Sequence, residues 1–456
     1  MAVSRITAML ASRPRARSFV ACLVAGAFAF AVSAADTKPA PTPTTTAKKK
    51  PATTKAKPGA KPAAKPAAKP AKPAPPPPPP AVELIGMVVM PAEQFRGGPP
   101  SGQFDGDGRR STAPRFDSQP VQGVSSIKPG PTQGAWWALS DNGFGSKWNS
   151  SDYRLCVYLF DVRPRTQAGP DSRVALQAVI ELSDPAKFFP WRLADEIEPE
   201  RQLTGADADP ESLVAMPDDT FWVGDEFGPW LLHFSVDGEL LSAPVELPDA
   251  VYSADHPLVI AHAATAKLEH SRGFEAMDLA GDNKTLVTIL EGTVAGDPAK
   301  SLRLQRYDTA AGKWLPGTLI YELDPDTVSV TDMSRIEGNR FVVVERDDQE
   351  GDAAKAKRVY SIDLDKALSS KEQAGKPLAK KLVIDLLAIG NSHGLAESLP
   401  PGTLFRFPYL TTESIQVLDR KHVVIVNDNN YPAKGGRGPN VPDATEWLWL
   451  ELGTSL

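Results

Sequence analysis

The chain has 456 residues, of which 50 are lysine or arginine and 56 are aspartate or glutamate. Residues 1–80 contain 14 of the basic residues and a single acid, Asp36, so residues 81–456 carry 36 basic and 55 acidic residues, a net charge near −19. This acidity argues against nucleic acid as a partner, because binding to the phosphate backbone needs a basic surface. It favours cations, or substrates that are bound through cations.

Residues 1–35 have the pattern of a signal peptide. An arginine-bearing start is followed by an apolar run over residues 19–35, which ends in small residues where a signal peptidase would cut. The run is shorter than the roughly 20 apolar residues of a membrane-spanning helix. We therefore expect cleavage, and export to the periplasm or the extracellular space.

Residues 36–80 have the composition of a disordered linker rich in lysine, alanine and proline. Ala-Lys-Pro repeats lead to the proline run 75–80, and almost no side chain in this segment could build a core. Proline-rich chain of this kind is extended and semi-rigid. A spacer is the simplest role, and binding of an anionic envelope polymer through the lysines is the alternative.

Residues 81–456 are too many for one conventional core, which usually stops growing at ~250–300 residues, so either two domains or a repeating architecture is expected. One pattern recurs five times: a short strand with a polar or acidic start, a turn, and a β-prone strand that ends in a carboxylate. Such units are typical of β-hairpins. They cover residues 123–127 with 136–143, 211–214 with 221–228, 274–277 with 285–292, 331–333 with 341–347, and 413–417 with 422–430.

Further strand-like runs lie between these hairpins, and about four strands per interval indicate an all-β fold, the β-propeller. The run 447–452 near the end of the chain and the run 82–89 could share the last blade and close the ring. We predict one propeller domain over residues 81–456, monomeric and with six blades. Five or seven blades are the alternatives.

Acids at the hairpin ends should form pairs, because the first residue of one strand lies beside the last residue of its partner. The predicted pairs are Glu211 with Asp225, Glu275 with Glu291, Asp332 with Glu345, and Glu413 with Asp428. If these hairpins are the inner strands of the blades, all pairs gather at one mouth of the channel, together with Asp141. Crowded carboxylates raise one another's pKa or bind a cation, and oxygen ligands suit Ca²⁺ or Mg²⁺. Alternatively, the acids cap turns or pair with Arg272, Arg346 and Arg335 in a solvated rim.

Several motifs occur in order along most of the domain. They are Asp209-Pro210-Glu211-Ser212, the segment 221–229, Arg272-Gly273-Phe274-Glu275-Ala276, Glu345-Arg346-Asp347 and the segment 426–432, with 123–127 and 139–143 before them and 436–438 and 443–447 after them. Together they resemble the phytase-like family, described as having esterase-like activity of phytase. Ser212 and Ala276 depart from the glycine that is common after the glutamate. The resemblance implies a secreted β-propeller that hydrolyses phosphoesters or related esters.

The candidate site follows from the acids. A divalent cation, with Ca²⁺ as first choice, would be bound by residues from the set Asp141, Glu211, Asp225, Glu275, Glu291, Glu345 and Asp428. The candidate catalytic residues are Glu211, Asp225, Glu275 and Asp428. A small ester or phosphoester substrate would be bound by Arg272, Arg346, Asn142, Asn429 and Asn430. For the asparagines, turn formation is an equally good explanation.

Two other classes of function stay open. One is a non-catalytic propeller, pinned by calcium, that binds a ligand or a partner at its acidic mouth. The other is a lactonase-type propeller, which would use similar acids around one ion. The histidines show none of the standard zinc-binding spacings. The segment 104–108 resembles the start of a calcium loop but lacks the later acids, so we expect a flexible insertion there.

Overall fold

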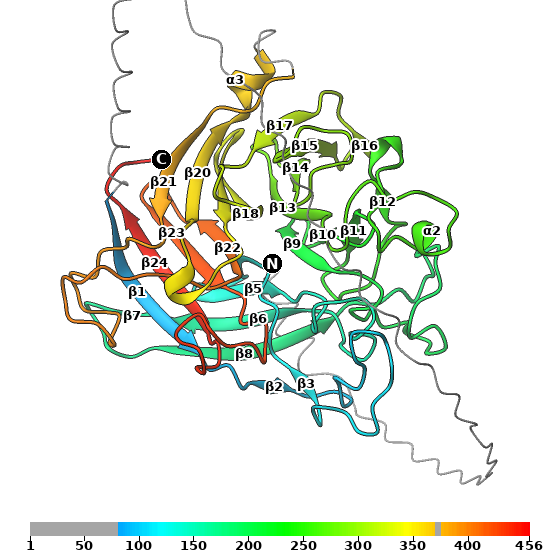
Figure 1. Ribbon diagram of the computed structural model, residues 1–456, viewed down its shortest axis with the longest axis horizontal. Helices are drawn as coiled ribbons and strands as arrows, with labels where there is room; N and C mark the ends of the chain where they lie inside the picture. The colour runs from blue at the N-terminus through cyan, green and yellow to red at the C-terminus, as the bar shows by residue number, and fades with distance from the viewer. Residues whose placement is uncertain (1–80, 370–374) are drawn as a thin grey trace, which may run out of the picture. The chain divides into compact units, whose positions relative to one another are not determined.

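The computed structural model describes residues 81–369 and 375–456. The predicted signal peptide and linker therefore lie outside the described residues. No helix within the described ranges is long and apolar enough to cross a membrane. The strands form five antiparallel sheets that surround a common centre, with one additional two-stranded sheet (Figure 1). The chain is thus an all-β propeller, as predicted.

Each sheet is one blade and contains four or five strands. The first blade contains β4 (Ser126–Pro129), β5 (Ala135–Leu139), β6 (Cys156–Arg163) and β8 (Arg173–Glu181), and the second contains β9 (Pro210–Ala215), β10 (Phe221–Asp225), β11 (Trp230–Phe234) and β12 (Val245–Glu246). The third contains β13 (Phe274–Leu279), β14 (Thr285–Leu290), β15 (Ser301–Asp308), β16 (Lys313–Trp314) and β17 (Leu319–Glu322), and the fourth contains β18 (Ser329–Glu337), β19 (Arg340–Arg346), β20 (Lys357–Asp363) and β21 (Lys380–Asp385). The last blade contains β22 (Thr412–Val417), β23 (His422–Asn427), β24 (Thr445–Leu452), β1 (Val82–Met90) and β7 (Arg165–Thr166).

The remaining elements are small. The two-stranded sheet pairs β2 (Phe95–Arg96) with β3 (Gln119–Pro120). The helices in the described part are two short α-helices, α2 (Pro257–Ile260) and α3 (Leu364–Ser369), and two single 3₁₀ turns, Pro248–Ala250 and Gly351–Ala353. Both α-helices lie at the periphery of the ring in Figure 1.

The ring is closed by pairing the first strand of the domain with the last. Strand β1 runs antiparallel to β24, from Val82 opposite Leu452 to Met90 opposite Thr445. The last blade therefore takes three strands from the end of the chain and one long strand from the start of the domain. This pairing confirms the predicted closure of the ring by strands from both ends of the domain.

The prediction of six blades is wrong, because each of the five predicted hairpins builds one blade and no sixth sheet is formed by the described residues. Each pair of neighbouring blades buries its own hydrophobic core between the sheets. The first and second blades pack through one such core, and the last and first blades pack through another that contains Trp136 and Trp447. The other three cores lie between the remaining neighbours. The length assigned to a sixth blade lies in long connections, such as residues 182–209 and 386–411.

The five inner strands β4, β9, β13, β18 and β22 lie side by side around the centre in this order. Each begins its blade and pairs with the next strand in the chain, so the starts of the inner strands and the ends of the second strands meet at the same end of the ring. This geometry gathers residues that lie far apart in sequence.

Closure of the ring should contribute much of the free energy of unfolding of the domain. Trp447 on β24 is fully buried and contacts Trp136 of the first blade, with ring centroids 5.7 Å apart. We expect Trp447→Ala to lower the free energy of unfolding by about 3–5 kcal/mol, since it opens a cavity in the closing core. Urea denaturation of the full chain measures this. Trp148→Ala, at a side chain that is 46% exposed, is the matched control and should cost less than about 1 kcal/mol. Equal costs for the two variants would contradict the closure argument.

Candidate functional site

Eight carboxylates line one pocket of about 300 Å³ at the end of the ring where the inner strands begin. They lie directly before or on the inner strands, or directly after the second strands, of four blades. Two arginines, Arg272 and Arg346, line the same pocket, so the carboxylates outnumber the guanidinium groups by six. The eight acids are Asp141, Asp209, Glu211, Glu226, Glu275, Glu291, Glu413 and Asp428.

Six of these acids are among those that the sequence predicts at the mouth. Glu275 on β13 and Glu291 after β14 come together, and so do Glu413 on β22 and Asp428 after β23. These are two of the four predicted pairs. Asp141 also reaches the pocket from the first blade, where burial, followed by the charges of Asp428 and Asp209, raises its pKa. The predicted gathering of acids at one mouth therefore takes place.

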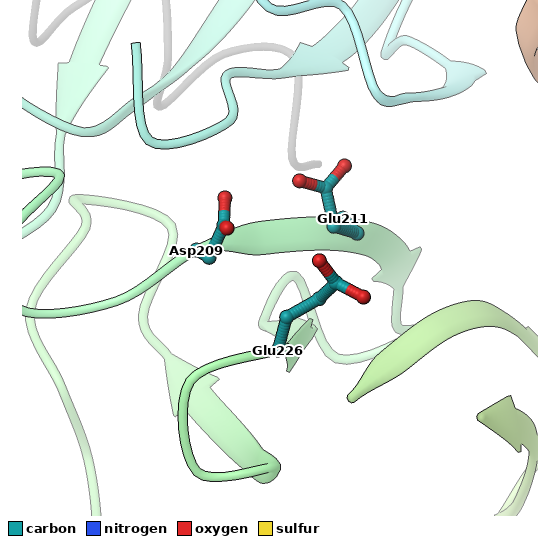
Figure 2. Close-up of side chains that lie close together, drawn as sticks. All are labelled: Asp209, Glu211 and Glu226. Atoms are coloured by element: carbon teal, nitrogen blue, oxygen red, sulfur yellow. The ribbon is translucent and has the colours of Figure 1, made fainter. Parts of the chain in front are cut away.

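Two groups of three carboxylates have oxygens within 4.8 Å of one another, and both contain Glu226. The first group is Asp209, Glu211 and Glu226, and the second is Glu226, Glu275 and Glu291. Figure 2 shows the first group, with Glu226 extending from the loop after β10 toward Glu211 on β9. Glu226 is 4% exposed, and its buried Oε1 has no hydrogen-bond partner. A buried carboxylate oxygen without a donor is costly, and a divalent cation would satisfy it.

The two arginines neutralise only one side of this cluster. Arg272 forms an ion pair with Glu291. Arg346 at the end of β19 lies with Nη2 at 3.6 Å from Glu291 and Nε at 3.9 Å from Glu413. Burial by itself would lower the pKa of Arg346, but Glu413, Glu291 and Glu275 raise it above the usual value. Both guanidinium groups therefore stay charged, and the predicted rim pairing holds for these two arginines. The third arginine of that alternative, Arg335, instead donates to the Ala280 carbonyl at 2.8 Å.

Burial and mutual repulsion raise the pKa values of the acids. Burial, followed by the charges of Asp209 and Glu275, holds the pKa of Glu211 well above its usual range. Burial and then Glu291 and Glu226 do the same for Glu275. Burial raises the pKa of Glu413 to about 7 and that of Asp428 to about 6. At neutral pH the cluster must retain protons or bind cations.

A second set of contacts fixes Asp209. Ser271 donates its hydroxyl to Asp209 Oδ2 at 2.8 Å, and the backbone N–H of Asn142 donates to Asp209 Oδ1 at 3.2 Å. Asp255 holds this loop by accepting the N–H of Ser271 at 3.0 Å, and its Oδ1 lies 2.8 Å from His270 Nδ1. Asp209 is therefore oriented before any ligand enters.

Asp225 does not line the pocket, although the sequence predicts it beside Glu211. A register shift between Gly224 and Asp225 places Asp225 opposite Pro210. Its carboxylate turns into the blade and accepts the N–H groups of Asp209 at 2.8 Å and Gly228 at 2.7 Å. The next residue, Glu226, takes the place at the mouth. The predicted pairing of Glu211 with Asp225 is therefore wrong, and the partner is Glu226.

The predicted pair of Asp332 and Glu345 does not form. A register shift between Val330 and Met333 sets Val330 opposite Glu345. Asp332 accepts the N–H groups of Met333 and Ile415 at 2.8 and 3.0 Å. Glu345 accepts instead from Tyr321, Thr327 and Lys380, away from the lining of the acidic pocket.

Of the three asparagines predicted to bind substrate, two line the pocket and one does not. Asn142 and Asn430 line the pocket, and Asn142 Oδ1 accepts the N–H of Gly145 at 2.7 Å, which is the turn-forming role. Asn430 donates its amide to the Thr411 hydroxyl. Asn429 is 1% exposed, does not line the pocket, and has neither amide atom hydrogen-bonded in the described part of the chain.

Asp209 and Glu226 are the pocket acids that the sequence prediction missed. Both stand next to a predicted site residue, in Asp209-Pro210-Glu211 and in Asp225-Glu226. Proline at position 210 and the glycines at 224 and 228 were the available signals, because such residues often accompany irregular strand ends.

One motif of a different chemistry also occurs. Gly390-Asn391-Ser392-His393-Gly394 has the Gly-x-Ser-x-Gly spacing of a serine-hydrolase nucleophile elbow. It lies in the long connection between β21 and β22, and no helix follows it there. The Ser392 hydroxyl donates to Glu83 Oε1 at 2.6 Å. The strand-turn-helix context that the elbow needs is therefore missing.

The raised pKa values predict a pH-dependent stability. Burial raises the pKa of Asp225, as of Glu413, to about 7, so the folded chain binds more protons than the unfolded chain between about pH 4 and 7. Stability then falls as the pH rises through this window. In the presence of a chelator, we expect Tm at pH 8 to lie about 5 °C or more below Tm at pH 5. Added Ca²⁺ should raise Tm more at pH 8 than at pH 5. Glu413→Gln should weaken the pH dependence. A Tm in chelator that rises from pH 5 to pH 8 would contradict this.

Comparison with known proteins gives distant relatives. A protein named "Uncharacterized secreted protein" from Arthroderma benhamiae is 25% identical over 182 residues, 32% of this chain and 35% of that protein. The match thus spans about a third of the length of that relative. Among solved structures, the Malassezia sympodialis allergen Mala s 1 is similar with 14% identity and a TM-score of 0.38, covering 82% of this chain and 96% of the allergen. An exo-β-1,3-galactanase from Phanerochaete chrysosporium is similar with 10% identity and a TM-score of 0.38, covering 80% and 64%.

The family assignment rests on the sequence itself. Residues 119–431, which include all five hairpins and all eight acids of the pocket, match the phytase-like family, described as "Esterase-like activity of phytase". The match covers well over half of the chain. The chain belongs to the phytase-like family.

Proposed function

We propose that the chain is an exported hydrolase of phosphoesters or related esters that needs a divalent cation, with Ca²⁺ as first candidate, bound in the acidic pocket. The observation that carries the proposal is that Glu226 belongs to both sets of three carboxylates, while its buried Oε1 has no hydrogen-bond partner. The family description supports ester hydrolysis, and the secreted relative supports export.

The residues present fit such a cation. Asp209, Glu211 and Glu226 offer a first set of oxygen ligands, and Glu275 and Glu291 extend it through Glu226. Hard oxygen donors at this density suit Ca²⁺ or Mg²⁺. When bound, a divalent cation would polarise an ester or phosphoryl oxygen and lower the pKa of a water molecule.

The chain's own groups would bind and orient the substrate. Arg346 is buried, charged and has an Nε without a hydrogen-bond partner, so it can donate to an anionic oxygen in the pocket. Arg272, whose side chain is 37% exposed, would guide the anion at the rim. Asp428 lies outside both carboxylate groups, and the Gly123 N–H at 2.9 Å holds its orientation, as a general base requires.

The test is a turnover screen with the full chain. Phosphomonoesters, phosphodiesters, carboxylic esters and lactones are assayed with Ca²⁺, Mg²⁺ or chelator. We expect cation-dependent turnover, and a loss of about 100-fold or more in kcat/KM for Glu211→Gln and Glu226→Gln with unchanged circular dichroism. Glu269→Gln, at an exposed glutamate of the neighbouring loop, should retain full activity. Full activity in chelator, or in both site variants, would overturn the proposal.

The screen also separates the alternatives. Turnover confined to lactones would favour a lactonase-type propeller. Calcium binding without turnover on any ester would favour a non-catalytic propeller in which the ion pins the mouth. In both cases Glu226→Gln should still abolish binding of the cation, so calorimetric titration with Ca²⁺ accompanies each assay.

A further inference from the structure

Residues 97–118, between β2 and β3, lie before the part of the chain that matches the family, yet they wall a second pocket. This pocket has a volume of about 250 Å³ and takes Gly102, Phe104 and Arg115 from the segment. It shares Asp141, Gly145 and Asn430 with the acidic pocket. The two pockets are therefore adjacent.

The segment is attached to the propeller on both sides of residues 104–108, whose flexibility stays a prediction. The Asp152 carboxylate accepts the N–H groups of Gly102 at 3.0 Å and Gln103 at 2.7 Å. Phe116 packs against Tyr431, with ring centroids 5.5 Å apart, and against Phe144, with centroids 6.0 Å apart. A wall tied down by backbone hydrogen bonds and aromatic contacts can define the shape of a binding site.

Arg115 is the only basic residue that lines this second pocket, and Asp141 is the only acid there. Its guanidinium carbon lies 5.3 Å from the centre of the Phe116 ring, and it forms no salt bridge with a described residue. A guanidinium held over an aromatic face keeps the N–H groups at its edge available for an anion. Gly102 permits this packing, because at its φ of +72° an added Cβ would lie 2.9 Å from Arg115 Cβ.

The other walls suit a ring. Phe104, Phe144 and Tyr431 line the pocket with aromatic carbon, and the amide groups of Asn149 and Asn430 are held by hydrogen bonds to neighbouring protein groups. The acidic pocket, in contrast, repels anions unless a cation is bound. The second pocket thus differs in chemistry from the first and lies next to it.

We propose that the second pocket binds the part of the substrate that remains outside the cation site, a ring that carries a carboxylate, and that Arg115 binds this carboxylate. The inference rests on the proposed function for the position of the ester group. It makes the 97–118 segment the element that determines substrate specificity in this chain.

The test measures binding with non-hydrolysable probes. Phenylphosphonate, 3-phosphonobenzoate and 4-phosphonobenzoate are titrated into the full chain in Ca²⁺ by calorimetry. We expect at least one phosphonobenzoate to bind about tenfold more tightly than phenylphosphonate, which is about 1.4 kcal/mol. Arg115→Ala should remove this preference and leave the affinity for phenylphosphonate unchanged. Arg110→Ala, at an exposed arginine of the same segment that does not line the pocket, should change nothing.

Three outcomes would overturn the proposal: equal affinities for all probes, no binding of any probe, or equal weakening of all probes by Arg115→Ala. Failure of the hydrolase proposal looks different. Without turnover on any ester, the preference for a phosphonobenzoate and its loss in Arg115→Ala would still be measured, since phosphonates need only bind. Glu226→Gln should weaken all three probes alike and keep their ratio, which separates the cation site from the second pocket.

Discussion

Repulsion between buried carboxylates is the constraint on which this site depends. Two unit charges about 4 Å apart interact by about 4 kcal/mol at the effective dielectric near a protein surface. Glu226 takes part in two groups of three carboxylates, so several such repulsions add up around it. The free energy of unfolding of a whole domain is only about 5–15 kcal/mol. The fully ionised cluster would therefore cost a large part of the folding free energy. Protons, the two arginines and a bound cation are the available ways to lower this cost.

The propeller makes this crowding possible because it does not let the acids move apart. Each acid is attached to a strand end, and each strand belongs to a blade that packs on both neighbours through a separate hydrophobic core. The pairing of β1 with β24 then closes the ring. Hydrogen bonds add local orientation, such as those that the backbone N–H of Gly123 donates to Asp428 and the Ser271 hydroxyl donates to Asp209. Stability gained between the blades thus holds a destabilising group of charges at the mouth.

Repetition made much of the fold predictable from the sequence. The five hairpins, the shared closing blade and the gathering of acids at one mouth all follow from strand periodicity and from the rule that hairpin ends meet. The number of blades was overestimated, although only five hairpins were found, because the chain length left in long connections was not recognised as such. Individual acids were misplaced where one-residue register shifts occur, as at Asp225 and near Asp332, because a shift of one residue turns a side chain to the other face. Such shifts leave only weak traces in a single sequence, here Pro210 and the neighbouring glycines.

The central claim is that this cluster holds a divalent cation between Asp209, Glu211 and Glu226. The most direct measurement is anomalous scattering from a crystal of the full chain grown with Ca²⁺, collected at a wavelength where calcium scatters anomalously. The account predicts a peak within coordination distance, about 2.3–2.6 Å, of oxygens of these three carboxylates. A well-ordered pocket that contains only water at saturating Ca²⁺, with no anomalous peak among the eight acids, would contradict it.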